Sequence, residues 1–177
     1  MTVYKGRVAG NLTLNKGDDA TAVTEVGGGL YILVEGAQLP VLTSVGGGLY
    51  ISAGYRLFAP QLKQVAGKDI SGAEASADLL RKIAEVATAT PGALNMCNWH
   101  CGTSHCIAGW AVHLMGEAGY ALEADLAKKV GEDRKTLAAG NVLLGVEASA
   151  LFFLSDDKGL SALHRVLAGK PALEGAL

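Results

Sequence analysis

The chain has 177 residues, of which half are hydrophobic but only 6% aromatic, and its formal net charge is −2 with no long run of one sign. This length suffices to bury a sizeable core in one or two domains, and the abundant glycine favours close packing. Non-specific binding to nucleic acid or to a membrane surface needs a basic patch, and the sequence shows none. We therefore expect neither nucleic acid nor a membrane as a partner.

The cysteines and the hydropathy pattern predict a compartment. Three cysteines fall within residues 97–106, an odd and crowded set that is no disulfide framework. The first residues lack the apolar stretch of a signal peptide, and nowhere do about eighteen apolar residues follow one another. We expect neither secretion nor membrane insertion, and a reducing cytoplasm as the location.

Two segments in the first half of the chain are nearly identical. Residues 23–32 read VTEVGGGLYI and residues 42–51 read LTSVGGGLYI, an offset of 19 residues. Weaker copies flank them, residues 8–14 at an offset of 18 and residues 62–67 at an offset of 20. Self-similarity at a fixed period of about 20 residues is the signature of a solenoid. The pattern predicts about four imperfect rungs of 18–20 residues, degraded at both ends as capping turns are.

The residues within each copy fit a rung. Leu30 and Ile32 alternate with Tyr31 at the period of a strand, and the same trio returns one rung later. The three glycines allow positive φ and predict a tight corner where a Cβ would clash, and Pro40 and Pro60 suit the opposite bend. A flexible glycine-rich linker would not carry aligned apolar columns. The further inward columns that we expect pair Val23 with Leu42 and Val26 with Val45.

The repeat also resembles a known kind of rung. Residues 8–67, with the segment LPVLTSVGGGLYI, resemble the leucine-rich-like β-solenoid rungs of bacterial and prophage-encoded proteins, and more distantly receptor L-domain rungs. The resemblance implies a binding scaffold. Residues 1–70 are therefore predicted to form a short right-handed β-solenoid domain.

After the repeat, the spacing of the apolar residues changes from that of a strand to that of a helix. Residues 71–74, Ser-Gly-Ala-Glu, form a capping box, and the helix should stop before Pro91. Its position directly after the last rung predicts that it covers the open end of the solenoid, whose backbone groups would otherwise stay unpaired. The apolar residues at helical spacing are Leu79, Leu80, Ile83 and Val86.

The rest of the chain predicts a helical bundle over residues 71–177, and so an α+β fold. A second helix should begin near Thr103, with Thr103 or Ser104 as N-cap, and end at Gly116. Within it, Ala108 and Gly109 leave room for a neighbouring helix. Further helices are expected over residues 122–130, 133–144 (closed by Gly145), 147–154 and 160–168 (closed by Gly169).

Three histidines and all three cysteines gather in residues 97–106 and at His113. One interpretation is structural. Cys106 lies beside Ile107 and Trp110 where a core position is expected, and a free buried cysteine behaves as a small apolar residue. His113 would then form a hydrogen bond within the bundle.

A metal site is the second interpretation. Cys97, Cys101 and His105 are each four residues apart, which places them on one face of a continuous helix, and Cys106 or His100 would complete a tetrahedral zinc site. The Gly-Thr pair that follows Cys101 is expected to break such a helix. Zinc is the one cofactor that the sequence suggests.

A thiol nucleophile is the third interpretation. Cys101 precedes the predicted start of a helix, where the helix dipole lowers the pKa of a thiol. His100, His105 or His113 would serve as the base, with Glu117 to orient it.

A second resemblance covers this segment. Residues 101–114, CGTSHCIAGWAVHL, resemble the motif CGTxxCIAGWAVHL of uncharacterised bacterial and phage proteins, and the similarity extends to residues 119–123 and 151–153. It implies a shared helical domain and no activity. Because both cysteines of the motif recur and the position of His105 varies, the resemblance favours Cys101 and Cys106 as the residues with a shared role.

The sequence therefore favours a non-enzymatic protein-interaction module of phage or prophage origin, with a protein as partner. An inhibitor of a bacterial defence or host complex is one concrete form. The alternative is an enzyme or zinc protein that uses Cys101, Cys106 and the neighbouring histidines. A homodimer through exposed rung edges or small-residue helices is a third possibility. The glycine triplets lack the lysine and helix start of a phosphate-binding loop.

Overall fold

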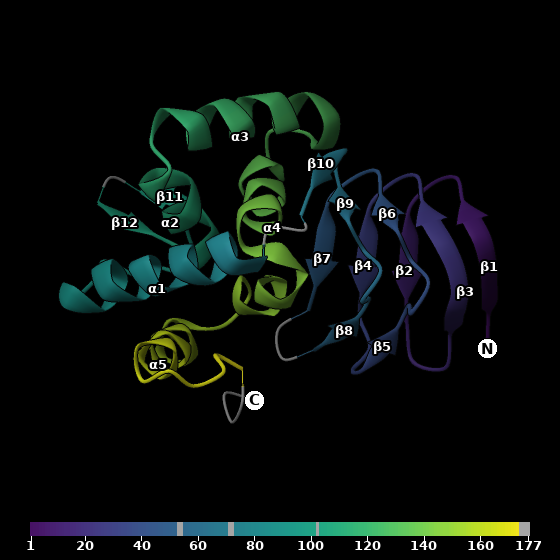
Figure 1. Cartoon of the computed structure of the whole chain (residues 1–177), viewed down its shortest axis with the longest axis horizontal. Helices are drawn as coiled ribbons and strands as arrows, with labels where there is room; N and C mark the ends of the chain where they lie inside the picture. Colours follow the sequence, from purple (N-terminus) through teal and green to yellow (C-terminus); the bar gives the residue numbers. More distant parts are fainter. Residues whose placement is uncertain (53–54, 71–72, 102, 174–177) are drawn as a thin grey trace.

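The computed structural model describes residues 1–52, 55–70, 73–101 and 103–173, and its fold is α+β. The first 70 residues wind into a β-solenoid of about three turns, and the helices lie beyond its last rung (Figure 1). The predicted solenoid with a C-terminal helical part is confirmed. None of the described helices is long and apolar enough to cross a membrane.

Stacked strands form three ladders along the solenoid. The first ladder is parallel except for its last strand, and its order is β1 (Val3–Val8), β3 (Asp19–Val26), β6 (Ser44–Val45), β9 (Gln64–Val65) and β10 (Lys68–Asp69). The second ladder is β2 (Leu12–Leu14), β4 (Leu30–Ile32) and β7 (Leu49–Ile51), and the third is β5 (Ala37–Gln38) with β8 (Leu57–Phe58).

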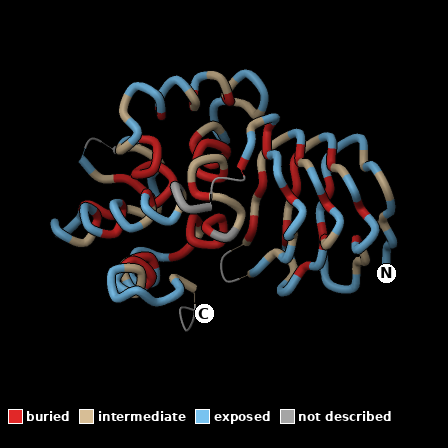
Figure 2. The backbone as a smooth tube through the Cα atoms, viewed as in Figure 1, coloured by how far each residue is buried: buried red, intermediate tan, exposed pale blue. Residues whose placement is uncertain are grey.

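The strand register reproduces the spacing of the repeat. Leu12 pairs with Leu30 and Leu30 with Leu49, which are steps of 18 and 19 residues, and Val45 pairs with Val65 after a step of 20. These leucines and valines are buried inside the coil (Figure 2). The predicted columns of Leu30 with Leu49 and of Val26 with Val45 are therefore present, and each rung covers the apolar face of the previous one.

The prolines lie in corresponding turns on successive rungs. Leu42 donates its N–H to the carbonyl of Leu39 across Pro40, and the turn around Pro60 repeats the pattern one rung later. Proline fits the second position of such a turn because its φ is fixed near the required value. The bend predicted at the prolines is confirmed.

The glycine triplets form the predicted corner where a Cβ would clash, but without the positive φ that the sequence allows. None of the six glycines in residues 27–29 and 46–48 has a positive φ, so the corner does not depend on a left-handed backbone. Instead, a Cβ added to Gly46 would lie 2.2 Å from the carbonyl oxygen of Gly27, and one added to Gly27 would lie 2.3 Å from that of Ala9. Glycine is needed here because the backbones of successive rungs approach too closely for a side chain.

Five α-helices and one 3-10 helix follow in the described part of the chain. They are α1 (Ala73–Ala89), α2 (Ile107–Leu114), α3 (Glu117–Val130), α4 (Lys135–Ala148), η1 (Ser149–Leu151) and α5 (Asp156–Leu167). Helix α1 stops before Pro91 as predicted, whereas the side chains of the capping box at residues 71–74 lie outside the description. The helix expected to end at residue 144 has a kink there, at Gly145 with φ +77°, and α4 continues to Ala148. The separate helix expected over residues 147–154 is replaced by the end of α4 and the three-residue 3-10 helix η1.

Three predicted helix starts are wrong. The second helix begins at Ile107 with Cys106 as N-cap, not near Thr103, because residues 104–105 are paired in a strand. The third begins at Glu117 instead of residue 122, and the last begins at Asp156 instead of residue 160. Ala108 does let a helix approach, since it lies against Gly140 of α4, where a Cβ would come within 2.6 Å of the Ala108 side chain.

The cover of the last rung comes mainly from α4 and η1, not from α1 as predicted. Ala138 and Ala139 of α4 and Ala150 of η1 belong to the same buried cluster as the solenoid residues, whereas α1 packs against other helices. Asn141 of α4 donates its side-chain N–H to the backbone carbonyl of Leu49 at 2.8 Å. The core thus continues past residue 70, the boundary that we predicted between two domains.

Asn141→Ala should weaken this junction. Asn141 is fully buried, and its loss leaves the Leu49 carbonyl and the Ser149 hydroxyl, which donates to Asn141, without their partner. We expect the free energy of unfolding to fall by about 2 kcal/mol, the usual effect of leaving buried polar groups without a hydrogen-bond partner. Urea denaturation of the variant and the wild type measures this, and a difference below about 0.5 kcal/mol, typical of surface changes, would contradict it.

Candidate functional site

The Cys/His segment folds as a hairpin that leads into α2. Strand β11 (His100–Cys101) pairs antiparallel with β12 (Ser104–His105), with His100 opposite His105. The hairpin is fixed to the preceding loop because the backbone N–H of His105 donates to the carbonyl of Ala93. The continuous helix required by the predicted metal spacing is therefore absent from the described residues.

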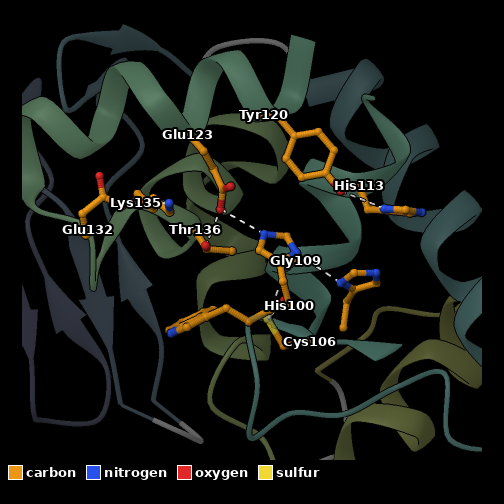
Figure 3. Close-up of polar contacts among 11 residues, drawn as sticks. His100, Cys106, Gly109, His113, Tyr120, Glu123, Glu132, Lys135 and Thr136 are labelled. Carbon is orange, nitrogen blue, oxygen red and sulfur yellow. Dashed lines mark hydrogen bonds and ion pairs between the residues drawn. The ribbon is translucent and has the colours of Figure 1, made fainter. Parts of the chain in front are cut away.

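A chain of hydrogen bonds runs from a buried carboxylate through two imidazoles (Figure 3). Glu123 of α3 contacts Nε2 of His100 at 3.0 Å, and Nδ1 of His100 contacts Nδ1 of His105 at 3.1 Å. The hydroxyl of Thr136 donates to the same Glu123 oxygen. His113 lies stacked on His105 with 4.7 Å between ring centroids, and its Nδ1 lies 2.9 Å from the hydroxyl of Tyr120.

Hydrogen-bond chemistry determines which ring nitrogen of His100 and of His105 carries the proton. A carboxylate only accepts, so His100 donates from Nε2 to Glu123 and its Nδ1 is an acceptor when the ring is neutral. His105 must then donate from Nδ1 to His100, which leaves Nε2 of His105 as a bare acceptor. That atom is buried and has no hydrogen-bond partner among the described residues.

Burial keeps His105 neutral. The residue is only 3% exposed, and this burial, followed by the neighbouring His113 and His100, lowers the pKa of His105 below its usual 6.5. Nothing in the sequence indicated that Glu123 would be the partner of His100. Sequence reasoning had placed Glu117 in the orienting role, yet the contact comes from a residue two turns further along α3.

Lowering the pH should destabilise the folded protein, because His105 is buried in its neutral form. Because the folded pKa of His105 is lowered, the unfolded chain binds the proton more readily, and stability declines as pH falls below about 6.5. We expect the free energy of unfolding to decrease between pH 7.5 and 5.5, by at most about 1.4 kcal/mol per pH unit for one proton.

Urea midpoints at several pH values measure this dependence. His164 on α5 is exposed, so His164→Gln should keep the slope, whereas His105→Phe should flatten it whatever its own cost in stability. A wild-type protein whose stability is constant or rises over this interval would show that His105 is not held neutral.

The cysteines do not form a reactive centre in the described residues. Cys106 is buried as the N-cap of α2, where its sulfur accepts the N–H of Gly109 at 3.2 Å, and burial raises the pKa of the Cys106 thiol to about 11. Cys97 is exposed. The side chain of Cys101, the predicted nucleophile, lies outside the described residues. Cys106 thus has the structural role that the first interpretation gave it.

The alkylation rates of Cys97 and Cys106 should differ strongly. A pKa raised from 9.0 to about 11 leaves Cys106 with about a hundredfold less thiolate near neutral pH, and burial slows its reaction further. We expect iodoacetamide at pH 8 to modify Cys97 long before Cys106, as measured by peptide mass spectrometry. Denaturant should equalise the two rates, and equal rates in the native protein would contradict the assignment.

The predicted metal ligands do not come together. Within the described part of the chain, no three His, Cys, Asp or Glu side chains are arranged to hold a metal ion. An ion bound between the Nδ1 atoms of His100 and His105 would force a proton onto Nε2 of His105, a buried position without an acceptor. The geometry accounts for these histidines as hydrogen-bonded partners.

A groove opens beside the hairpin, where the solenoid meets the helices. Its volume is about 340 Å³, and its lining comes from both halves of the chain. A larger hollow of about 820 Å³ is lined mostly by aliphatic side chains, and Arg56 there already donates to the carbonyl of Leu173. We call the smaller one the junction groove, lined by Tyr31, Gly48, Tyr50, Trp99, Asp133, Arg134, Leu137 and Phe153.

Aromatic rings form a continuous row along the junction groove. Tyr31 and Tyr50 pair on adjacent strands of the solenoid, with ring centroids 6.1 Å apart. Phe153 packs on Tyr50 at 4.3 Å, and Trp99 meets Phe153 edge-on at 6.4 Å. The guanidinium of Arg134 lies 5.5 Å from the Tyr31 ring centroid. The row thus extends the tyrosine column of the repeat onto the helical half.

Comparisons of the chain with models of protein families, with curated proteins and with solved structures find no match.

Proposed function

We propose that this chain is a non-enzymatic protein-interaction module whose binding surface is the junction groove. The observation that carries the proposal is the half-buried row of Tyr31, Tyr50, Phe153 and Trp99 with Arg134 at its edge. Tyrosine, tryptophan and arginine dominate the binding energy of protein interfaces, because they combine large contact area with polar groups.

The groove supplies what a protein partner needs. The rings are fixed by packing against one another, so they lose little side-chain freedom on binding. Asp133 and Arg134 are exposed at the rim, where charges choose the partner and its orientation. A partner that inserts an apolar side chain between Tyr50 and Trp99 and meets these two charges fits this surface.

Chemistry at the cysteines has weaker support. Cys106 is buried and its pKa is raised, the opposite of what a thiol nucleophile needs, and Cys97 is exposed. The resemblance of the repeat to prophage-encoded rungs favours a bacterial protein as partner and the cytoplasm as location. An inhibitor of a bacterial defence or host complex remains the concrete form of this proposal.

Capture from a bacterial lysate tests the proposal. The tagged wild type should retain a stoichiometric partner, and Arg134→Ala should reduce the retained amount at least about tenfold, as expected for an interface anchor. Arg81→Ala is the matched control, since Arg81 is exposed on α1 and does not line the groove. Failure to recover a partner, or equal capture by both variants, would overturn the proposal. Light scattering would show whether the partner is a second copy of the chain.

A further inference from the structure

The larger hollow is separate from the junction groove. Its volume is about 820 Å³, and none of the described residues that line it also lines the groove. Small-molecule sites in proteins span roughly 300–1,000 Å³, so the hollow has the size of a ligand site. Its chemistry can therefore be considered independently of the groove and of any protein partner.

The hollow lies beside the last strand of the third ladder. Helix α4 and η1 pack on β7, and α4 also contacts β9, so both of these strands lie against helices. The third ladder ends at β8, and Leu57 of that strand lines the hollow together with residues of α1, of α4 and of the segment 171–173. A ligand in the hollow would thus contact both halves of the chain.

Aliphatic side chains form most of the lining. Ile51, Leu62 and Ile70 come from the solenoid. Leu80 comes from α1 and Leu144 from α4. Among the described residues that line the hollow, none carries an aromatic ring, so the surface suits a flexible hydrocarbon chain better than a flat ring system. Burial of CH₂ groups against such a surface is favourable in proportion to the apolar area removed from water.

Arg56 is the only charged residue among the described residues of this lining. Its Nη2 donates to the carbonyl of Leu173 at 3.2 Å, and no carboxylate in the described part of the chain pairs with it. By contrast, Arg7, Arg81 and Arg134 each pair with a carboxylate. A guanidinium has several N–H donors, so the bond to Leu173 leaves donors for a ligand. A carboxylate matches their planar arrangement and supplies the missing opposite charge.

We propose that the larger hollow binds a fatty acid, with the carboxylate on Arg56 and the hydrocarbon chain along the aliphatic lining. This class of ligand combines the single negative charge that Arg56 calls for with the apolar chain that the rest of the lining calls for. The inference goes beyond the proposed function and does not rest on it. Binding of a fatty acid to the isolated chain can therefore succeed or fail whether or not a protein partner is found.

Calorimetric titration of the full chain with octanoate, decanoate and dodecanoate, each below its micelle concentration, tests the site. We expect saturable binding of one molecule per chain, with an affinity that rises up to about fourfold for each added CH₂ group that is buried. The change in heat capacity should be negative, because apolar surface leaves water. Failure of dodecanoate to bind saturably, or an affinity that does not depend on chain length, would overturn the proposal.

Removal of the guanidinium tests the position of the carboxylate. Arg56→Ala should weaken dodecanoate binding at least about tenfold, the usual effect of losing a charge-assisted hydrogen bond. Dodecanol has the same chain without the charge, so it should bind the variant and the wild type equally. Arg81→Ala is the matched control, because Arg81 is exposed on α1 and does not line the hollow. Equal affinity of Arg56→Ala and the wild type for dodecanoate would contradict the assignment.

A variant that fills the hollow tests the position of the hydrocarbon chain. Ala77 of α1 lines the hollow and is exposed, so Ala77→Trp places a large side chain there without disturbing a buried position. This variant should lose dodecanoate binding. Ala89→Trp, at the exposed end of the same helix and outside the lining, should keep it. Melting curves by circular dichroism check that both variants are folded, and a folded Ala77→Trp that binds dodecanoate like the wild type would overturn the site.

Discussion

Gly46→Ala should destabilise the solenoid by about 3 kcal/mol or more, the upper range for overpacking a rigid site. The added Cβ would lie 2.2 Å from the carbonyl oxygen of Gly27, an atom of the backbone that cannot rotate away. The stacked rungs are also joined there by the hydrogen bond from the N–H of Gly46 to the carbonyl of Val26. Relief requires the two rungs to separate, which breaks this bond and opens the valine column.

Gly48→Ala is the matched control within the same triplet. A Cβ on Gly48 meets nothing within 4 Å, and its φ is not positive, so alanine should change the free energy of unfolding by less than about 0.5 kcal/mol. Urea denaturation followed by circular dichroism compares the two variants. Equal stability of Gly46→Ala and Gly48→Ala would show that the triplet is a loop and not a close contact between rungs.

Gly109→Ala should reverse the usual effect of alanine in a helix. Intrinsic propensity alone would make the variant about 1 kcal/mol more stable, since Gly109 lies within α2. However, the new Cβ would lie 1.9 Å from the carbonyl oxygen of Trp99, and the hairpin would have to move away from α2. We expect a net loss of about 3 kcal/mol or more from this overpacking, together with a displaced Trp99.

Thermal denaturation and the Trp99 indole signal measure these two effects. Gly159→Ala in α5 provides the comparison, because the atoms nearest to its Cβ would belong to the flexible side chains of Leu94 and Met96, at 3.1 Å and 3.4 Å. That variant should lose far less stability. A stabilised Gly109→Ala would mean that the hairpin does not rest on α2 as described.

The fold of the first half follows from its sequence because the repeat encodes the long-range contacts directly. Aligning one copy on the next gives the pairs Leu30 with Leu49 and Val45 with Val65, which are the observed registers. The glycine triplet correctly predicts a corner where a Cβ would clash. The sequence does not reveal that the clash is with the backbone of the neighbouring rung, or that no positive φ is involved.

The candidate site was less predictable because it depends on contacts between elements distant in sequence. Residues 97–106 attracted attention through their cysteines, yet the described interactions run through His100, His105 and Glu123. Helical spacing misplaced the start of α2, since two short strands of only two residues leave no periodic signal. The contact between Tyr50 and Phe153 likewise could not be predicted without knowing which part of the helical half covers the last rung.

The most direct test of the junction groove as a binding surface is site-specific photo-cross-linking. A benzophenone amino acid in place of Asp133 puts the reactive group at the rim of the groove and leaves the anchor Arg134 intact, and the same substitution at Arg81 puts it on α1, outside the groove lining. In bacterial cells, the probe at position 133 should give one discrete cross-linked protein that the probe at position 81 does not. The absence of a cross-link at 133, or the same product from both positions, would contradict the account.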